Sequence, residues 1–193
     1  ALWTGYFNGI AKTNQALKAL ETAKLDGDLK LRYQAEVRFF RGYYYFNLVR
    51  WFGGVPKVLK VPLDAYEANN DPVYQTRATP DEIYALIIED LTFAKENLLI
   101  KGVMPVGRVT KGTATAMLAK VYLTRKNWQE AYTLSQEVIS SGSYSLLPDY
   151  SEIWRQVGDR SNEAIFEVQT GVYNNSDYGV PNYCVWQGPR VGG

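Results

Sequence analysis

The sequence contains no histidine and a single cysteine, Cys184. Without histidine, the chain cannot build a Ser-His-Asp or Cys-His nucleophilic centre or offer an imidazole ligand to a metal ion. One cysteine allows neither an internal disulfide nor a thiolate metal site. These absences exclude a large share of known enzyme mechanisms, and we expect no cofactor and no metal.

The sequence also lacks a long uncharged apolar run and an excess of charge of either sign. A membrane-spanning helix needs roughly 20 mostly apolar residues, and the most aromatic stretch is interrupted by Arg38, Arg41 and Arg50. The net charge is +1, from 21 basic and 20 acidic residues. This balance argues against a nucleic-acid partner, which would favour a basic face.

The sequence begins "ALWTGYFNGI", without a methionine and without a signal peptide. It ends on "GPRVGG", which reads as an unfinished loop. We interpret the sequence as a part of a longer protein, so the missing targeting signal carries no information about localisation.

Aromatic residues, in contrast, are abundant, with 15 tyrosines and 5 tryptophans. "RFFRGYYYFNLVRWF" (38–52) places eight aromatic residues in fifteen positions. One apolar stripe at helical spacing runs through Leu31, Ala35, Phe39, Gly42, Phe46 and Val49. Because Tyr43, Tyr44 and Tyr45 fill the remaining faces, we predict a buried helix over about 29–52. We interpret the run as core rather than as a ligand platform.

Four other segments have helical periodicity: about 2–25, 79–99, 110–126 and 128–141. In the first, Gly5 and Gly9 would permit close approach of a neighbour, and "LDGD" (25–28) predicts a glycine C-cap. The segment from 53 to 78 is predicted to be a long loop, which is usually functional or anchored by its own contacts.

The helix predicted over 79–99 begins with a capping box formed by Thr79 and Glu82. Two carboxylate pairs, Asp81/Glu82 and Glu89/Asp90, could indicate acid–base chemistry. We favour the simpler interpretation, in which they cap the helix and cover a solvated face.

Ala119, Tyr122 and Ala131 have the spacing of the small and aromatic positions of a tetratricopeptide repeat. Gly42 and Tyr45 correspond to Ala119 and Tyr122. We therefore predict a mainly α fold of tetratricopeptide-like hairpins with long decorating loops, in which 29–52 pairs with 79–99 and 110–126 pairs with 128–141. The helical repeat region would span 1–142 and a loop or extended region 143–193, with "NEAIFEVQT" (162–170) strand-like.

The sequence resembles the SusD/RagB family of outer-membrane nutrient-binding lipoproteins. The resemblance rests on an ordered set of blocks: "FFRGYYYFNLVRWFGGVPKV", "TPDEIYALIIEDLTFAKENL", "GRVTKGTATAMLAKVYLTRKNWQEA", "VISSGSYSL" and "NEAIFEV". It covers about residues 3–170. Family members are longer, so residues 1–193 would be part of one SusD-like domain without the lipid-anchoring cysteine and the C-terminal region. Cys184 stands in the wrong place to be that anchor.

The resemblance implies a protein on the extracellular face of the outer membrane, held there by a lipid anchor that this sequence does not include. It implies that the protein lies over a TonB-dependent SusC-type transporter and passes oligosaccharide to it, without catalysis. Three hypotheses stay open: a glycan-binding protein, the same fold binding peptides, and a protein–protein scaffold or a helical glycosidase using two carboxylates.

Sugars expose C–H faces that pack on aromatic rings and hydroxyls that pair with amides, carboxylates and arginine. The loop 171–190 offers this mixture, and the first helix offers second candidates. The candidate ligand-binding residues are Tyr173, Asn174, Asn175, Asp177, Tyr178, Tyr183, Trp186 and Arg190, together with Trp3 and Asn8. Each of them could instead have a purely structural role.

Overall fold

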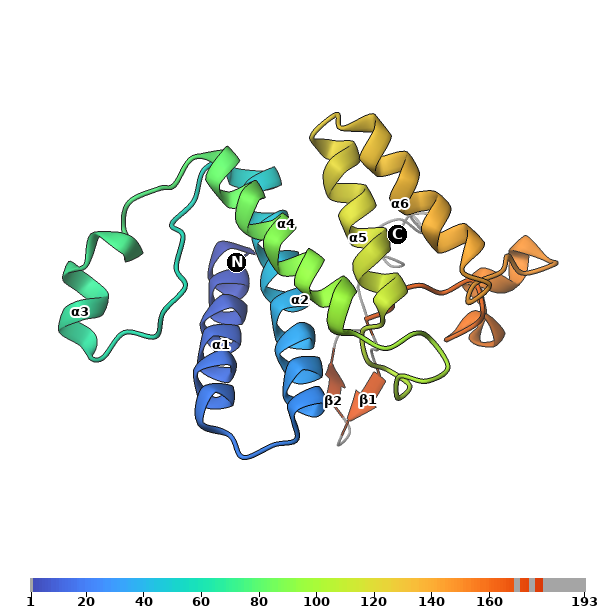
Figure 1. The fold of residues 1–193 in the computed structure, drawn as a ribbon, viewed down its shortest axis with the longest axis horizontal. Helices are drawn as coiled ribbons and strands as arrows, with labels where there is room; N and C mark the ends of the chain where they lie inside the picture. The colour runs from blue at the N-terminus through green and yellow to red at the C-terminus, as the bar shows by residue number, and fades with distance from the viewer. Residues whose placement is uncertain (1, 169–170, 174–175, 179–193) are drawn as a thin grey trace, which may run out of the picture.

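The aromatic run lies in α2 (Gly27–Phe52), which packs on α1 (Leu2–Thr22) and on α4 (Pro80–Asn97) in the computed structural model (Figure 1). The structure describes residues 2–168, 171–173 and 176–178. Phe39, Tyr45 and Phe46 are at most 1% exposed, and burying such a side chain stabilises the fold by about 1.5–3 kcal/mol. Tyr43 and Tyr44 are half-buried. The interpretation of the run as core is therefore correct for its central residues.

Helices α5 (Lys111–Thr124) and α6 (Trp128–Ser140) complete the helical body. The chain reverses direction from each long helix to the next, so that α2 pairs with α4 and α5 pairs with α6, while α4 and α5 join the two hairpins (Figure 1). The predicted mainly α fold and both predicted hairpins are confirmed. Among the described residues, no helix is long and apolar enough to cross a membrane.

Two of the three helical glycines discussed above let a neighbouring helix approach closely, and the third does not. A Cβ placed on Gly42 would lie 3.2 Å from Cγ of Leu91 in α4, so this glycine lets the two helices approach closely, as predicted. A Cβ on Gly9 would lie 2.6 Å from the ring of Tyr44, whereas one on Gly5 would meet nothing within 4 Å. The prediction of close approach is thus correct for Gly9 and wrong for Gly5.

The connection between α1 and α2 corrects a second prediction. Helix α1 ends at Thr22, and Gly27 is the first residue of α2. The Asp26 side chain accepts a hydrogen bond from the Asp28 N–H at 3.0 Å, which makes Asp26 the N-cap of α2. "LDGD" is therefore a helix start rather than a glycine C-cap, because the aspartate provides a capping acceptor.

The capping box at the start of α4 is formed as predicted. Thr79 N–H donates to Glu82 Oε2 at 2.8 Å, and Glu82 N–H donates to Thr79 Oγ1 at 3.3 Å. Asp90, in contrast, does not lie on a solvated face. It is fully buried, and its two carboxylate oxygens accept hydrogen bonds from Arg41 at 2.7 and 2.8 Å.

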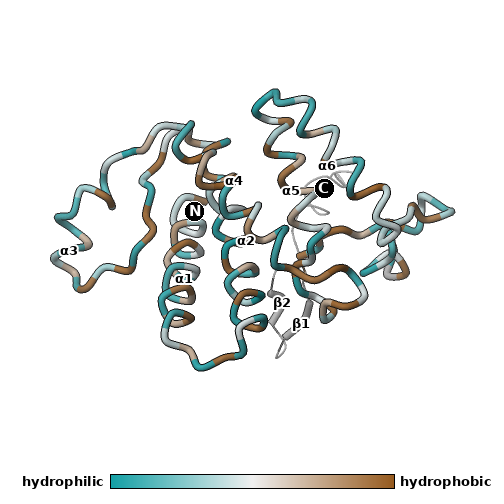
Figure 2. The backbone as a smooth tube through the Cα atoms, in the orientation of Figure 1, coloured by the Kyte–Doolittle hydropathy of each residue, from teal (hydrophilic) through white to brown (hydrophobic). Residues whose placement is uncertain are grey.

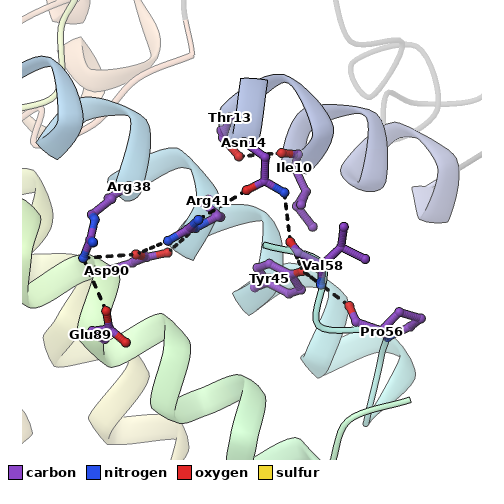
Figure 3. A network of polar contacts seen from close by, with 10 residues as sticks. All are labelled: Ile10, Thr13, Asn14, Arg38, Arg41, Tyr45, Pro56, Val58, Glu89 and Asp90. Carbon is purple, nitrogen blue, oxygen red and sulfur yellow. Dashed lines mark hydrogen bonds and ion pairs between the residues drawn. The ribbon is translucent and has the colours of Figure 1, made fainter. Parts of the chain in front are cut away.

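Figure 3 shows that this ion pair is one end of a longer polar network. Arg41 Nη1 donates to Asn14 Oδ1 at 3.3 Å, and Asn14 Nδ2 donates to the Val58 carbonyl at 2.9 Å. The network therefore connects α4, α2 and α1 to the segment after α2.

That segment forms a projecting arm, residues 55–77, rather than a plain loop (Figure 1). It contains α3 (Ala65–Asn70) and the 3-10 turn η1 (Pro72–Tyr74). At its neck, Ala78 N–H donates to the Val55 carbonyl at 3.0 Å, and Arg77 donates to the carbonyls of Phe52 and Gly54. The part of the arm before α3 carries apolar residues and faces α1, whereas α3 is mainly hydrophilic (Figure 2).

The chain after α6 differs most from its prediction. The 3-10 turns η2 (Tyr150–Trp154) and η3 (Gln156–Gly158) are followed by residues 161–168 without regular structure, so the strand-like interpretation of 162–170 is wrong for its described part. Instead, β1 (Gly171–Tyr173) and β2 (Ser176–Tyr178) pair as an antiparallel hairpin. Among the backbone groups of residues 162–168, the carbonyl of Asn162 accepts from the Ser145 N–H, and the carbonyls of Ala164 and Ile165 accept from the side chains of Lys101 and Thr113.

We expect Gly42→Leu to destabilise the protein by about 1–3 kcal/mol, because its side chain would overpack the contact with Leu91. Gly5→Ala is the matched control: its Cβ enters open space, and alanine should raise stability by about 0.5 kcal/mol through its helix propensity. Chemical denaturation of both variants measures this, and equal stabilities would contradict the close α2–α4 contact.

We expect Tyr45→Phe to lower stability by about 1–3 kcal/mol, because it leaves a buried backbone N–H without a partner. The Tyr45 hydroxyl accepts from Val58 N–H at 2.7 Å and lies 3.0 Å from the Val58 carbonyl. Hydrogen exchange should accelerate at Val58. Tyr66→Phe, at a residue 77% exposed on the arm, is the control. Unchanged exchange at Val58 would show that the hydroxyl does not hold the arm.

Candidate functional site

The predicted sugar-binding residues near the end of the chain divide into two groups. Tyr173, Asp177 and Tyr178 belong to the β1–β2 hairpin, where Val172 pairs with Asp177 and Tyr173 with Ser176. The others lie outside the described residues: Asn174, Asn175, Tyr183, Trp186 and Arg190. The structure therefore places three of the eight on one hairpin.

A basin of about 740 Å³ lies beside the segment that leads into the hairpin. This volume is within the range of about 300–1,000 Å³ that is typical of ligand pockets. The basin is lined by Phe40, Lys101, Gly102, residues 104–110, Gly142, Ser143, Arg160, Asn162 and residues 164–168. It has both an aromatic ring and charged and amide groups, which is the combination expected of a sugar site.

Lys101 fixes one wall of the basin. Its Nζ donates to the carbonyl of Ser161 at 2.7 Å and to that of Ala164 at 3.0 Å, and it lies 4.9 Å from the centroid of the Tyr144 ring. Burial lowers the pKa of Lys101, and the charge of Glu167 partly opposes this shift. Lys101 therefore ties the loop after α4 to the segment 161–164.

The same segment is held against the helices by Thr113 and Phe166. Thr113 Oγ1 donates to the Ile165 carbonyl at 2.9 Å. The Phe166 ring packs edge-on against Phe39 and Tyr43, with centroid distances of 5.5 and 5.8 Å. The aromatic run of α2 thus supports the chain five residues before the hairpin.

Two polar side chains in the basin are open to a ligand. The Arg160 guanidinium and the Asn162 amide have no hydrogen bond or ion pair within the described part of the chain. The Arg160 backbone is fixed, since its N–H donates to both oxygens of Glu167 at 3.1 and 3.0 Å. Neither residue could be identified from the sequence, because both lie in an irregular segment without periodicity.

Arg108, on the opposite rim, is already paired. Its Nη1 donates to Glu36 Oε1 at 2.9 Å, and its guanidinium lies 5.4 Å from the centroid of the Tyr33 ring. Burial raises the pKa of Glu36, and the positive charge of Arg108 opposes that effect. Arg108 therefore contributes to the shape of the basin more than to free hydrogen-bonding capacity.

Trp3 and Asn8, the second candidates, do not line the basin. Asn8 is exposed on α1. Trp3 is half-buried, and its ring contacts those of Phe7 and Phe52 at centroid distances of 4.8 and 5.1 Å. Trp3 lines a separate hollow between α1 and the arm.

A metal site has no basis in the described residues, among which no group of three or more His, Cys, Asp or Glu side chains could hold a metal ion. Asp90, whose position beside Glu89 could indicate acid–base chemistry, is occupied by Arg41. The residues that line the basin offer a ligand hydrogen bonding and ring stacking.

We expect Lys101→Met to lower stability by about 1–3 kcal/mol, because it removes two charge-assisted hydrogen bonds and keeps the apolar stem. Amide hydrogen exchange should accelerate over residues 161–168. Lys120→Met, at an exposed position of α5, is the matched control. If both variants exchange like the wild type, Lys101 does not anchor this segment.

The chain is similar to a known protein family and to individual known proteins. Residues 1–123 match the SusD-like family described as "Starch-binding associating with outer membrane". SusD-like protein P2 of Formosa agariphila is 32% identical over 160 residues, covering 80% of this chain and 30% of that protein. The starch-binding protein SusD of Bacteroides thetaiotaomicron is 29% identical over 174 residues, covering 84% of this chain and 29% of that protein.

The chain also superposes on solved structures of SusD-like proteins. A SusD-like protein from Bacteroides fragilis superposes with a TM-score of 0.78 at 32% identity, covering 87% of this chain and 33% of that one. A laminarin-binding SusD-like protein superposes with a TM-score of 0.74 at 32% identity, covering 84% and 35%. The chain thus spans about a third of the length of these relatives. Since the family match covers more than half of its residues, the chain belongs to the SusD-like family.

Proposed function

We propose that this protein binds oligosaccharide at the cell surface and delivers it to a TonB-dependent SusC-type transporter of the outer membrane. The observation that carries the proposal is membership of the SusD-like family, which includes a starch-binding and a laminarin-binding protein among the relatives. On this proposal the protein lies on the extracellular face of the outer membrane, attached through a lipid anchor, and performs no catalysis.

The basin supports glycan as the ligand. Phe40 offers an aromatic ring, Arg160 offers donors, and Asn162 offers both a donor and an acceptor. Sugar hydroxyls can pair with these groups while a C–H face packs on the ring. The basin's volume of about 740 Å³ admits several linked sugar residues rather than one.

The basin and the segment after it would act together. Phe166 and Lys101 fix residues 161–168, and this segment leads directly into the hairpin that carries Tyr173, Asp177 and Tyr178. We propose that the predicted residues between 173 and 190 contact the glycan next to the basin. The near-neutral net charge of +1 is consistent with an uncharged ligand and with the absence of a nucleic-acid partner.

A titration of the intact protein with maltoheptaose, laminarin and a mixed peptide pool tests the proposal. We expect binding of a glycan in the millimolar-to-micromolar range, about −4 to −8 kcal/mol. Trp186→Ala and Tyr178→Ala should each weaken binding about tenfold, or about 1.4 kcal/mol, without altering the melting temperature.

Trp128→Ala, at a residue 61% exposed on α6, is the matched control and should bind like the wild type. Peptide binding without glycan binding would show that the ligand is a peptide rather than a glycan. Hydrolysis of a glycan during the titration would contradict the binding role. Wild-type affinity in both loop variants would place the glycan contacts elsewhere.

A further inference from the structure

One end of the helical body combines exposed tryptophans with lysines that have no ionic partner. It consists of the end of α2, the start of α4 and the turn between α5 and α6, which lie along the upper edge of Figure 1. We call this surface the basic end and define it as residues 50–57, 77–82 and 120–130.

Contacts between these segments hold the basic end together. Arg125 pairs with Asp81 at 2.7 Å, which joins the α5–α6 turn to the start of α4. Arg77 donates to the Phe52 carbonyl at 3.0 Å, which joins the end of α2 to the neck of the arm. The surface is therefore formed before any partner arrives, and a preformed surface loses less conformational entropy when it binds.

The basic end is positively charged. It holds six basic and three acidic residues, a net charge of +3, whereas the whole chain has a net charge of +1. Two of the acidic residues are already engaged, since Asp81 pairs with Arg125 and Glu82 forms the capping box of α4. The ammonium groups of Lys120 and Lys126 have no hydrogen bond or ion pair within the described part of the chain. Their charges are available to an anionic partner.

Large apolar side chains are exposed among these charges. Trp51 is 66% exposed, Leu123 is 55% exposed and Trp128 is 61% exposed. None of the three lines the basin or the hollow between α1 and the arm. An indole ring has an apolar body and one N–H donor, which suits a boundary that is apolar on one side and wet on the other.

The tip of the arm also exposes apolar side chains, but its charge is of the opposite sign. Leu63 is 84% exposed and Tyr66 is 77% exposed. The charged residues around them are Asp64, Glu67 and Asp71, with Lys60. An anionic partner would therefore select the basic end over the tip of the arm.

The combination of lysine and tryptophan favours a lipid surface over a protein as this partner. Lysine is depleted in protein–protein interfaces, whereas lysines near anionic headgroups strengthen binding to a membrane. Tryptophan is enriched at the level of the headgroups. Since no helix of the described residues can cross a membrane, the contact would stay at that level.

We propose that the basic end lies against anionic lipid headgroups, with the rings of Trp51 and Trp128 among them and the ammonium groups of Lys120 and Lys126 on their phosphates. This contact goes beyond glycan binding and does not depend on it.

The contact has a consequence for the basin. Helix α4 runs from the basic end over 18 residues, about 27 Å, to the loop 101–110, most of which lines the basin. Helix α5 returns from that loop to the basic end. The basin and the basic end therefore lie at opposite ends of these helices, so a membrane at the basic end leaves the basin facing outward.

Sedimentation of the unlipidated 193-residue chain with vesicles tests the proposal. One set contains phosphatidylcholine and phosphatidylglycerol in a ratio of about 7:3, and the other contains phosphatidylcholine alone. We expect binding to the mixed vesicles to be stronger by about tenfold or more. It should weaken as salt rises from about 0.1 to about 1 M, because the screening length falls from about 10 to about 3 Å.

The double variant Lys120→Glu/Lys126→Glu should weaken binding to the mixed vesicles by about tenfold or more, because it replaces attraction by repulsion. Lys12→Glu/Lys18→Glu is the matched control. It makes the same change in net charge at two exposed positions of α1 outside the basic end, and it should bind like the wild type.

The tryptophans provide a test that does not depend on charge. Trp51→Ala and Trp128→Ala should each weaken vesicle binding about tenfold, since binding scales with the apolar area that enters the interface. Tyr66→Ala, on the tip of the arm, is the control. Brominated lipid should quench the fluorescence of the bound wild type. The double variant Trp51→Phe/Trp128→Phe should lose most of this quenching, whereas Trp3→Phe should keep it.

The outcomes separate this inference from the proposed function. If the chain binds neither vesicle, or binds both equally, or if the basic-end variants bind like the wild type, the basic end is not a lipid-binding surface. Self-association that these substitutions abolish, without vesicle binding, would show that the basic end binds protein instead. The glycan titration uses no vesicles, so its failure would overturn the proposed function alone.

Discussion

The buried ion pair between Arg41 and Asp90 is the interaction on which the arrangement of the other elements depends. Removing two charges from water is costly, and the cost is offset here by two short hydrogen bonds in a parallel, bidentate geometry. The pair joins α2 to α4, and the remaining donor of Arg41 orients Asn14, which holds the arm. Loss of one partner would leave a buried charge, a change that typically costs about 3–5 kcal/mol.

Helix α2 connects this network to both hollows. Tyr45 is fully buried, and its hydroxyl fixes Val58 beside the hollow between α1 and the arm. Tyr43, two residues earlier, packs against Phe166 at the approach to the basin. Tyr43 and Tyr45 can serve opposite sides of the helix because each step along a helix rotates by about 100°, so that residues two apart point about 200° apart. The aromatic run is therefore part of the core, and it also supports the walls of the basin and of the hollow between α1 and the arm.

The sequence predicts the long helices well because their periodicity and caps are local properties. Thr79 and Glu82 form a capping box at the start of any helix with that sequence. Gly42 lies on the apolar stripe of its helix, so its small size predicts that a second helix approaches closely there. Asp90 could not be placed from the sequence, since a carboxylate is buried only when tertiary structure supplies a partner such as Arg41. Its neighbour Glu89 is exposed, so spacing alone does not distinguish the two.

The shapes of the basin and of the hollow between α1 and the arm depend even more on tertiary structure. For the hollow between α1 and the arm, the α1 wall is visible in the sequence as a helical face. Its second wall comes from residues 56–74, whose distance from α1 is set by Asn14 and Tyr45. In the basin, the residues that hold the backbone differ from those that are open to a ligand. Lys101 and Phe166 fix the basin while Arg160 and Asn162 face into it. Because of this separation, Arg160 and Asn162 can be substituted without loss of the contacts that position the segment.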